Sequence, residues 1–194
     1  MTAGRRDWAR QINFLNPVSD DTSGGVMSRV WLVPVLLLAL AGCKDDPRRV
    51  ENENLGFAAT FPGPPKLHRH TDPGPFGEVE WFDMAMSPSG RLDETFSVAV
   101  GNLPPGDKGG TSPREILTTY QNFLGYRFGA IRRSELPTDK GPGFRYKVNG
   151  PNGGMVEGIV VVRRGRLHHA QAIVRREGDP RTAAFLDDFE VRTR

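Results

Sequence analysis

An uncharged apolar run, residues 30–42, ends against the only cysteine and constrains this 194-residue chain more than any other feature. As a helix the run would be about 20 Å long, at about 1.5 Å per residue, which is shorter than the roughly 30 Å hydrocarbon core of a bilayer. That length is typical of the apolar segment of a signal peptide. Met27 and Arg29 precede it and supply a start residue and a positive charge. We therefore predict that residues 27–42 are a signal peptide, outside the folded domain.

The end of this run, L-A-G-C at residues 40–43, resembles the lipobox of bacterial prolipoproteins. The resemblance implies that diacylglycerol is attached to the sulfur of Cys43, that the chain is cleaved before it, and that the new amino terminus is acylated. Small residues before the cysteine would give a peptidase access to the backbone. Two or three acyl chains anchor firmly where one would be marginal. An uncleaved anchor and a plain buried helix are the alternatives.

Residues 1–26 do not fit the start of a signal peptide, because they contain Asp7, Asp20 and Asp21. We predict that translation begins at Met27 and that residues 1–26 are a non-native or misannotated extension, with a long leader as the alternative. In some envelope systems an Asp directly after the lipidated cysteine retains the protein in the inner membrane. Lys44 occupies that position here and favours the outer membrane, facing the periplasm.

The composition describes a soluble domain rather than a nucleic-acid-binding or disulfide-rich one. Apolar residues make up 37% of the chain and charged residues 25%, and the formal net charge is only +3. So small an excess argues against nucleic acid as a partner. A single cysteine excludes an internal disulfide and a cysteine-rich metal site.

Residues 43–54 form a polar, charged stretch, which we interpret as the lipidated cysteine followed by a short tether. Residues 55–194 then form a single domain. Alternating apolar residues bounded by Gly and Pro predict its strands. The predicted strands are 56–61, 78–84, 95–100, 130–136, 143–149, 155–163, 167–175 and 189–191. Strands 155–163 and 167–175 are adjacent and predict a hairpin.

The strongest local signal is a capping box, with Ser112 at the N-cap and Glu115 three residues later, and Pro at the first helical position. An apolar stripe follows it up to Gly125, which we expect to end the helix. A second, short helix is predicted for 181–187 after Asp179 and a proline. The predicted fold class is α+β: a mainly antiparallel twisted sheet flanked by one long and one short helix.

Two apolar motifs frame this domain: F-x-x-x-F-P-G-x-P from Phe57 to Pro65, and A-x-F-L-D-x-F from Ala183 to Phe189. With the central helix they resemble the PsbP-like α/β/α sandwich over roughly residues 55–194. The chain departs from that pattern at Asp188, where Ser is commoner, and in lacking an aromatic residue at the 166–167 step. Members of the class are mostly accessory or assembly proteins, so the resemblance implies a non-enzymatic role without catalytic residues, metal or cofactor.

The histidines are the first residues to weigh as sites. His68 and His70 would share a face on a strand, as metal ligands can, but no cysteine or acidic partner is near them in sequence. We expect surface histidines in a loop. His168 and His169 are adjacent and should face opposite sides of their strand, one buried and the other exposed.

The carboxylate pairs 45–46 and 187–188 are adjacent in sequence and should point apart, so we expect solvated surface charge rather than acid–base chemistry.

The candidate contact with a membrane or a partner is formed by the arginines at the hairpin turn, Arg163, Arg164 and Arg166. Arg175 and Arg176 belong to the same basic set. Each charge would contribute about 1 kcal/mol beside anionic headgroups. Plain solubility and edge protection are the alternative. The sequence thus predicts a lipid-anchored, non-enzymatic accessory, binding or assembly module, held to the membrane through Cys43 and with an envelope protein as a candidate partner. A small-ligand carrier and an envelope enzyme with a site invisible in sequence stay open.

Overall fold

The computed structural model describes residues 46–88, 90, 93–103, 111–137, 140–150 and 153–192. The predicted extension, the signal peptide and Cys43 lie outside these ranges. Among the described residues, no helix combines the length and apolar character needed to cross a bilayer.

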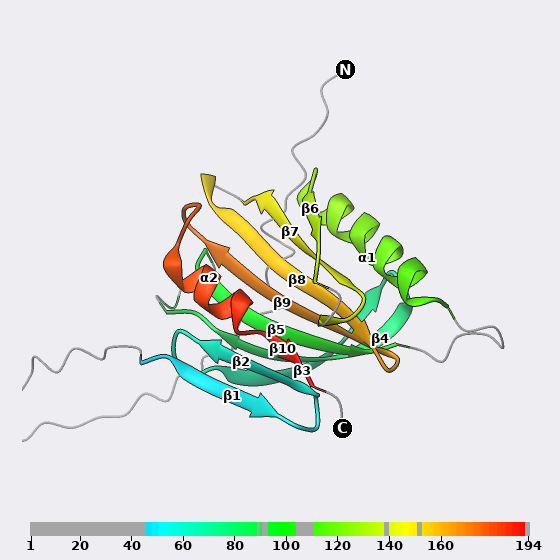
Figure 1. Ribbon diagram of the computed structural model, residues 1–194, viewed down its shortest axis with the longest axis horizontal. Helices are drawn as coiled ribbons and strands as arrows, with labels where there is room; N and C mark the ends of the chain where they lie inside the picture. The colour runs from blue at the N-terminus through cyan, green and yellow to red at the C-terminus, as the bar shows by residue number, and fades with distance from the viewer. Residues whose placement is uncertain are drawn as a thin grey trace, which may run out of the picture. The chain divides into compact units, whose positions relative to one another are not determined.

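Over the residues that the structure describes, the domain consists of two antiparallel sheets and two helices (Figure 1). The larger sheet has the strand order β3 (Lys66–Gly74), β4 (Gly77–Met86), β5 (Thr95–Asn102), β9 (Arg166–Val174), β8 (Met155–Arg163), β7 (Gly143–Asn149) and β6 (Arg132–Glu135). The smaller sheet has the order β1 (Arg48–Asn52), β2 (Phe57–Phe61) and β10 (Glu190–Val191). The helices are α1 (Pro113–Phe128) and α2 (Pro180–Asp187). The α+β prediction with a mainly antiparallel sheet is confirmed, and the separate small sheet is an addition to it.

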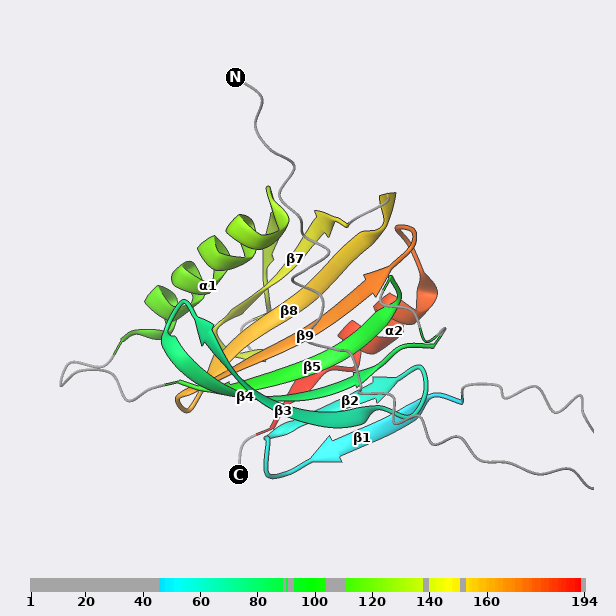
Figure 2. The same ribbon diagram turned by 180° about the vertical axis from the view of Figure 1, so that it is seen from behind.

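The large sheet is covered on both faces (Figures 1 and 2). α1 packs on one face, over β7 and β8, while α2 packs against β9, β8 and β2 on the other. Each face therefore has its own core, one centred on Tyr120 of α1 and one on Phe185 of α2. β8 contributes to both, which explains why its valine-rich sequence is buried at eight consecutive positions.

The opening and closing motifs meet in the second of these cores. Phe57 and Phe61 of β2 are fully buried, and the ring of Phe61 lies 5.2 Å from that of Phe185 in α2. Phe96 of β5 closes the group, with its ring centroid 5.6 Å from Phe185. The two ends of the domain are thus joined through aromatic packing.

The polar tether predicted for residues 43–54 is wrong over 48–52, which form β1 and pair with β2. Val50 packs against the core, while Arg49 and Glu51 point outward. Their charges are matched by the C-terminal segment: Arg49 pairs with Asp188 at 2.7 Å and Glu51 with Arg192 at 2.7 Å. The stretch looked like a linker because its partners lie about 140 residues away.

Two further predictions are corrected. Lys66–Gly74 was not predicted as a strand, yet it forms the edge strand β3, whose residues are mostly exposed and so lack an apolar alternation. α1 does not end at Gly125 but continues to Phe128, and Gly129 caps it with φ 92° and an N–H bond to the Gly125 carbonyl. Phe128 packs against the core, and this contact offsets the roughly 1 kcal/mol cost of a helical glycine.

Candidate functional site

The turn between β8 and β9 is a two-residue turn made by Arg164 and Gly165. Their φ angles are 50° and 71°, and a tight hairpin turn of the I′ type requires positive values at both positions. Arg163 and Arg166 are therefore the last facing pair of the ladder, and their side chains lie on the same side of the sheet. The hairpin prediction is confirmed, with a shorter loop than expected.

A second turn, between β1 and β2, lies opposite this hairpin. The Asn52 side chain accepts from the Leu55 N–H at 3.0 Å, and the Asn52 carbonyl accepts from the Gly56 N–H at 2.8 Å. Gly56 has φ 71° and would hold a Cβ only 3.3 Å from the Arg192 carbonyl oxygen, so glycine suits this position. Fixed in this way, the turn directs the carbonyls of Asn54 and Leu55 toward β9.

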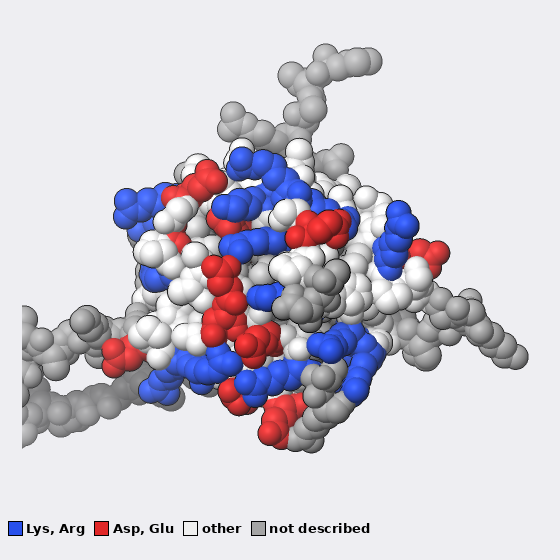
Figure 3. Space-filling model, in the orientation of Figure 1, with Lys and Arg blue, Asp and Glu red and all other residues white. Residues whose placement is uncertain are grey.

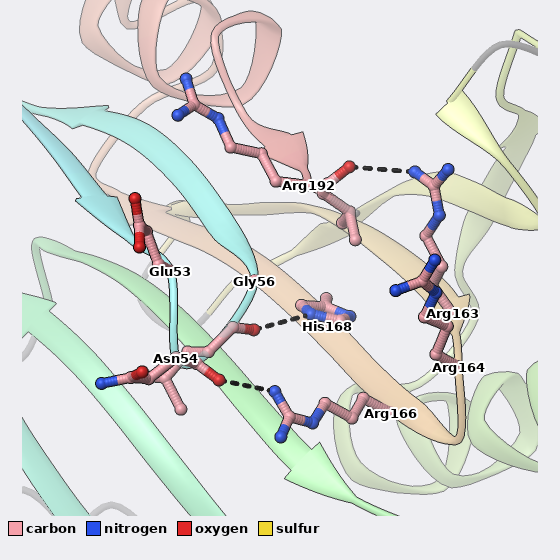
Figure 4. Close-up of a pocket in the computed structure, with 10 residues that line it drawn as sticks. Glu53, Asn54, Gly56, Arg163, Arg164, Arg166, His168 and Arg192 are labelled. Atoms are coloured by element: carbon pink, nitrogen blue, oxygen red, sulfur yellow. Dashed lines mark hydrogen bonds between the residues drawn. The ribbon is translucent and has the colours of Figure 1, made fainter. Parts of the chain in front are cut away.

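The two turns enclose a hollow of about 580 Å³ (Figure 4). Arg163 Nη1 donates to the Val191 carbonyl at 3.0 Å, and Arg166 Nη1 donates to the Asn54 carbonyl at 2.7 Å. Because these acceptors are neutral, the bonds orient the guanidinium groups without cancelling their charge. The lining residues are Glu53, Asn54, Leu55, Gly56, Arg163, Arg164, Arg166, His168, Val191 and Arg192.

Positive charge dominates this hollow. In Figure 3 basic side chains gather beside the β8–β9 turn. Of the four lining arginines, Arg192 is paired with Glu51, which lies outside the lining. Glu53 offsets one further charge. In Figure 4 the Glu53 and Arg192 side chains point away from the space between Arg163 and Arg166. With Glu51 counted as the partner of Arg192, the described lining keeps a formal excess of two positive charges.

His168 forms part of the buried wall of the hollow. It is only 2% exposed, and its Nε2 lies 3.1 Å from the Leu55 carbonyl. A carbonyl only accepts, so Nε2 carries the proton. The pKa of His168 is lowered to about 4, mainly by burial. The hydrogen bond to the Leu55 carbonyl raises this pKa, whereas the charges of Arg166 and Arg163 lower it. The ring is neutral, and its buried Nδ1 has no hydrogen-bond partner in the described part of the chain.

His169 faces the opposite side of β9, as predicted, but the expectation that one of the two histidines is exposed is wrong. The His169 ring accepts or donates at both nitrogens, with the Tyr120 hydroxyl 3.0 Å from Nδ1 and the Tyr146 hydroxyl 2.8 Å from Nε2. Gln171 donates to the same Tyr146 hydroxyl at 2.8 Å. Burial lowers the pKa of His169 to about 3. This closed network joins α1 to the sheet.

The other candidate residues are not brought into the hollow. His68 and His70 lie on β3 rather than in a loop, and His70 Nδ1 lies 3.2 Å from Asp83 Oδ2. Burial raises the pKa of Asp83. Within the described ranges no three His, Cys, Asp or Glu side chains are grouped as a metal site requires. Arg175 lies at the far end of β9 and pairs with Asp93 at 3.2 Å.

The adjacent carboxylates Asp187 and Asp188 point apart, as predicted. Asp187 pairs with Arg145 at 2.8 Å, and Asp188 pairs with Arg49 and accepts from the Thr60 hydroxyl at 2.7 Å. The two carboxylates therefore pair with arginines on different strands, Asp187 with Arg145 of β7 and Asp188 with Arg49 of β1. The Asp45–Asp46 pair lies partly outside the described residues.

The sequence predicted Arg163, Arg164 and Arg166 as a contact surface, but it did not predict the residues that line the hollow opposite them. The carbonyls of Asn54 and Leu55 belong to the stretch assigned to the tether and its border, over a hundred residues away. An Asn followed four residues later by a Gly was the one local signal for a turn there.

No protein-family model and no curated protein matches this chain. Among solved structures, the chain is similar to the solution structure of cyanobacterial PsbP (CyanoP) from Synechocystis sp. PCC 6803. The TM-score is 0.43 and the identity 13%, over 82% of this chain and 99% of that one. CyanoP is a PsbP protein, the class that the motifs at Phe57–Pro65 and Ala183–Phe189 resemble, but a similarity at this level does not assign the chain to that family.

Proposed function

We propose that this chain is a lipid-anchored protein of the cell envelope whose folded domain is a non-enzymatic binding or accessory module. The observation that carries the binding role is the arginine-lined hollow between the β1–β2 and β8–β9 turns. Its lining suits binding better than catalysis, because arginine stays protonated and His168 is buried, neutral and bonded to a carbonyl. The assignment to a PsbP-like sandwich is part of the same proposal and is supported by the contact of Phe61 with Phe185.

The packing under α1 favours this module over a carrier of apolar ligands. The space between α1 and the sheet is occupied by large side chains, with Trp81 and Tyr120 6.3 Å apart between ring centroids. Tyr146 is fully buried in the same layer. His169 has both ring nitrogens bonded, which fits a structural network rather than an enzyme site.

The anchor would hold the domain close to its membrane. Four residues lie between Cys43 and Arg48, the first residue of β1, and the five Cα–Cα steps that they span extend at most about 18 Å. β1 then runs its five residues, about 17 Å, before the turn that lines the hollow. The hollow therefore opens at the end of β1 that is remote from the anchor, where a soluble ligand or a partner protein could reach it.

The anchor is tested by replacing Cys43 with Ser in the producing cell. We expect the parent chain to incorporate labelled palmitate and to fractionate with membranes, and Cys43→Ser to do neither. Lys44→Asp is the matched control, since it keeps the cysteine: it should label normally but shift from the outer to the inner membrane fraction. A Cys43→Ser chain that still labels and partitions into detergent would refute the anchor.

The binding role is tested by chemical crosslinking on intact envelopes, followed by purification of the tagged chain. We expect a partner protein to crosslink to the parent chain and to be lost in the double variant Arg163→Gln/Arg166→Gln. Arg132→Gln, on the exposed edge strand β6, removes one charge far from the hollow and should keep the crosslink. Retention of the same crosslinks in the double variant would contradict a role for the hollow.

A further inference from the structure

We propose that the hollow between the two turns binds a doubly charged phosphate monoester group, held by Arg163 and Arg166. This inference rests on the proposed binding function and names the chemistry of its ligand. The phosphate can belong to a soluble metabolite or to a lipid headgroup, and the experiment below separates the two sources.

The charge of the lining sets the charge of the ligand. Arg192 is compensated by Glu51, and Arg164 and Glu53 together contribute no net formal charge. The remaining excess belongs to Arg163 and Arg166, which are partners in the last pair of the β8–β9 ladder. Their guanidinium groups reach different walls of the hollow, at the Val191 and Asn54 carbonyls (Figure 4). A phosphate monoester carries about −1.5 to −2 at neutral pH, which matches two guanidinium groups better than a single carboxylate does.

The geometry keeps those two groups in place for a ligand. Each guanidinium uses one nitrogen on a backbone carbonyl, Val191 for Arg163 and Asn54 for Arg166, and retains further N–H donors. Guanidinium forks match phosphate oxygens in pairs, and a side chain that is already oriented loses less entropy on binding. The hollow, at about 580 Å³, also has room for the organic part of the ligand, against Leu55 and Val191.

The pH dependence of binding would come from the ligand rather than from the protein. The arginines stay charged, and His168, with a pKa of about 4, stays neutral above pH 5. A monoester loses its second proton near pH 6. Protonation of Glu53 at lower pH would favour an anion and so act in the opposite direction. Tighter binding as the pH rises would therefore report the dianion.

The test is calorimetric titration of the full chain in neutral detergent with glycerol 3-phosphate, and separately with micelles containing phosphatidic acid, whose headgroup is a monoester. We expect binding near one to one in at least one arm. With glycerol 3-phosphate, binding at pH 7.5 should be about fourfold tighter than at pH 5.5, the ratio of the dianion fractions for a second pKa near 6. Binding in the first arm alone identifies a soluble ligand, and binding in the second alone identifies a lipid.

Variants locate the binding. Arg163→Gln and Arg166→Gln should each weaken it about tenfold or more, since each removes a charge-assisted hydrogen bond. Arg132→Gln should leave it unchanged. No heat of binding in either arm, equal weakening by Arg132→Gln, or equal affinity for the monoanion dimethyl phosphate would overturn the proposal. The parent chain's pH series needs no variant, so it decides even if a variant fails to fold. If the parent chain binds neither phosphate probe but still forms the arginine-dependent envelope crosslink, this inference is refuted and the proposed function stands.

Discussion

The two adjacent buried histidines make the stability of this domain depend on pH. Burial lowers the pKa of His168 to about 4 and that of His169 to about 3, whereas both titrate near 6.5 in the unfolded chain. The folded state thus excludes protons that the unfolded state binds. Their contribution to the free energy of unfolding is fully present above pH 6.5. It is lost as the pH falls below 6.5, down to about 4 for His168 and about 3 for His169.

The size of the effect follows from these values. At pH 5 the protonation of one unfolded histidine with a pKa of 6.5 favours unfolding by about 2 kcal/mol, and neither folded histidine is appreciably protonated. The two together should lower the free energy of unfolding by about 4 kcal/mol between pH 7.5 and pH 5. Asp83 acts in the opposite direction, because burial raises its pKa and its protonation favours the folded state.

A difference measurement isolates the histidines from Asp83 and the other carboxylates. Urea unfolding of the full chain carrying Cys43→Ser, followed by circular dichroism, gives the free energy of unfolding at each pH. The double variant His168→Gln/His169→Gln cannot take up these protons, while glutamine can still donate to the Leu55 carbonyl. We expect the gap between parent and variant to change by about 4 kcal/mol over this range. A gap that stays within about 1 kcal/mol would mean that the histidines are not held neutral.

Three smaller predictions concern packing and helix ends. A Cβ on Gly158 would lie 2.5 Å from the Tyr146 ring and 2.8 Å from the Ala170 carbonyl, so Gly158→Ala should destabilise by about 1–3 kcal/mol. Gly125→Ala is its control, since the space there is open and the helix should gain about 0.5–1 kcal/mol in the same urea assay. Phe185→Ala should cost about 3–5 kcal/mol by removing the ring that joins β2 to β5, and unchanged thermal unfolding would contradict that packing. Ser112→Ala should cost about 1 kcal/mol, because the Ser112 hydroxyl accepts from the Glu115 N–H, and helix-specific hydrogen exchange would detect it.

Local chemistry alone determined several features of this protein. The capping box at Ser112 fixed where α1 begins, and Asp179 fixed the start of α2, because a helix N-terminus needs a side-chain acceptor close in sequence. The alternation of apolar and polar residues determined the strands that bury one face, such as β5. The sequence also singled out Cys43 as the candidate lipid site, which remains a prediction.

Only the tertiary structure decided the features whose partners lie far apart in sequence. β1 reads as a linker until Arg49 meets Asp188 and Glu51 meets Arg192, and the exposed edge strand β3 carries no burial pattern to recognise. The candidate site follows the same rule. The sequence marked three arginines at a turn, but a turn of like charges is not a binding site. The opposite wall, formed by the carbonyls of Asn54 and Val191, comes from chain packing, because backbone carbonyls have no sequence signature and become ligands for arginine only when folding places them there.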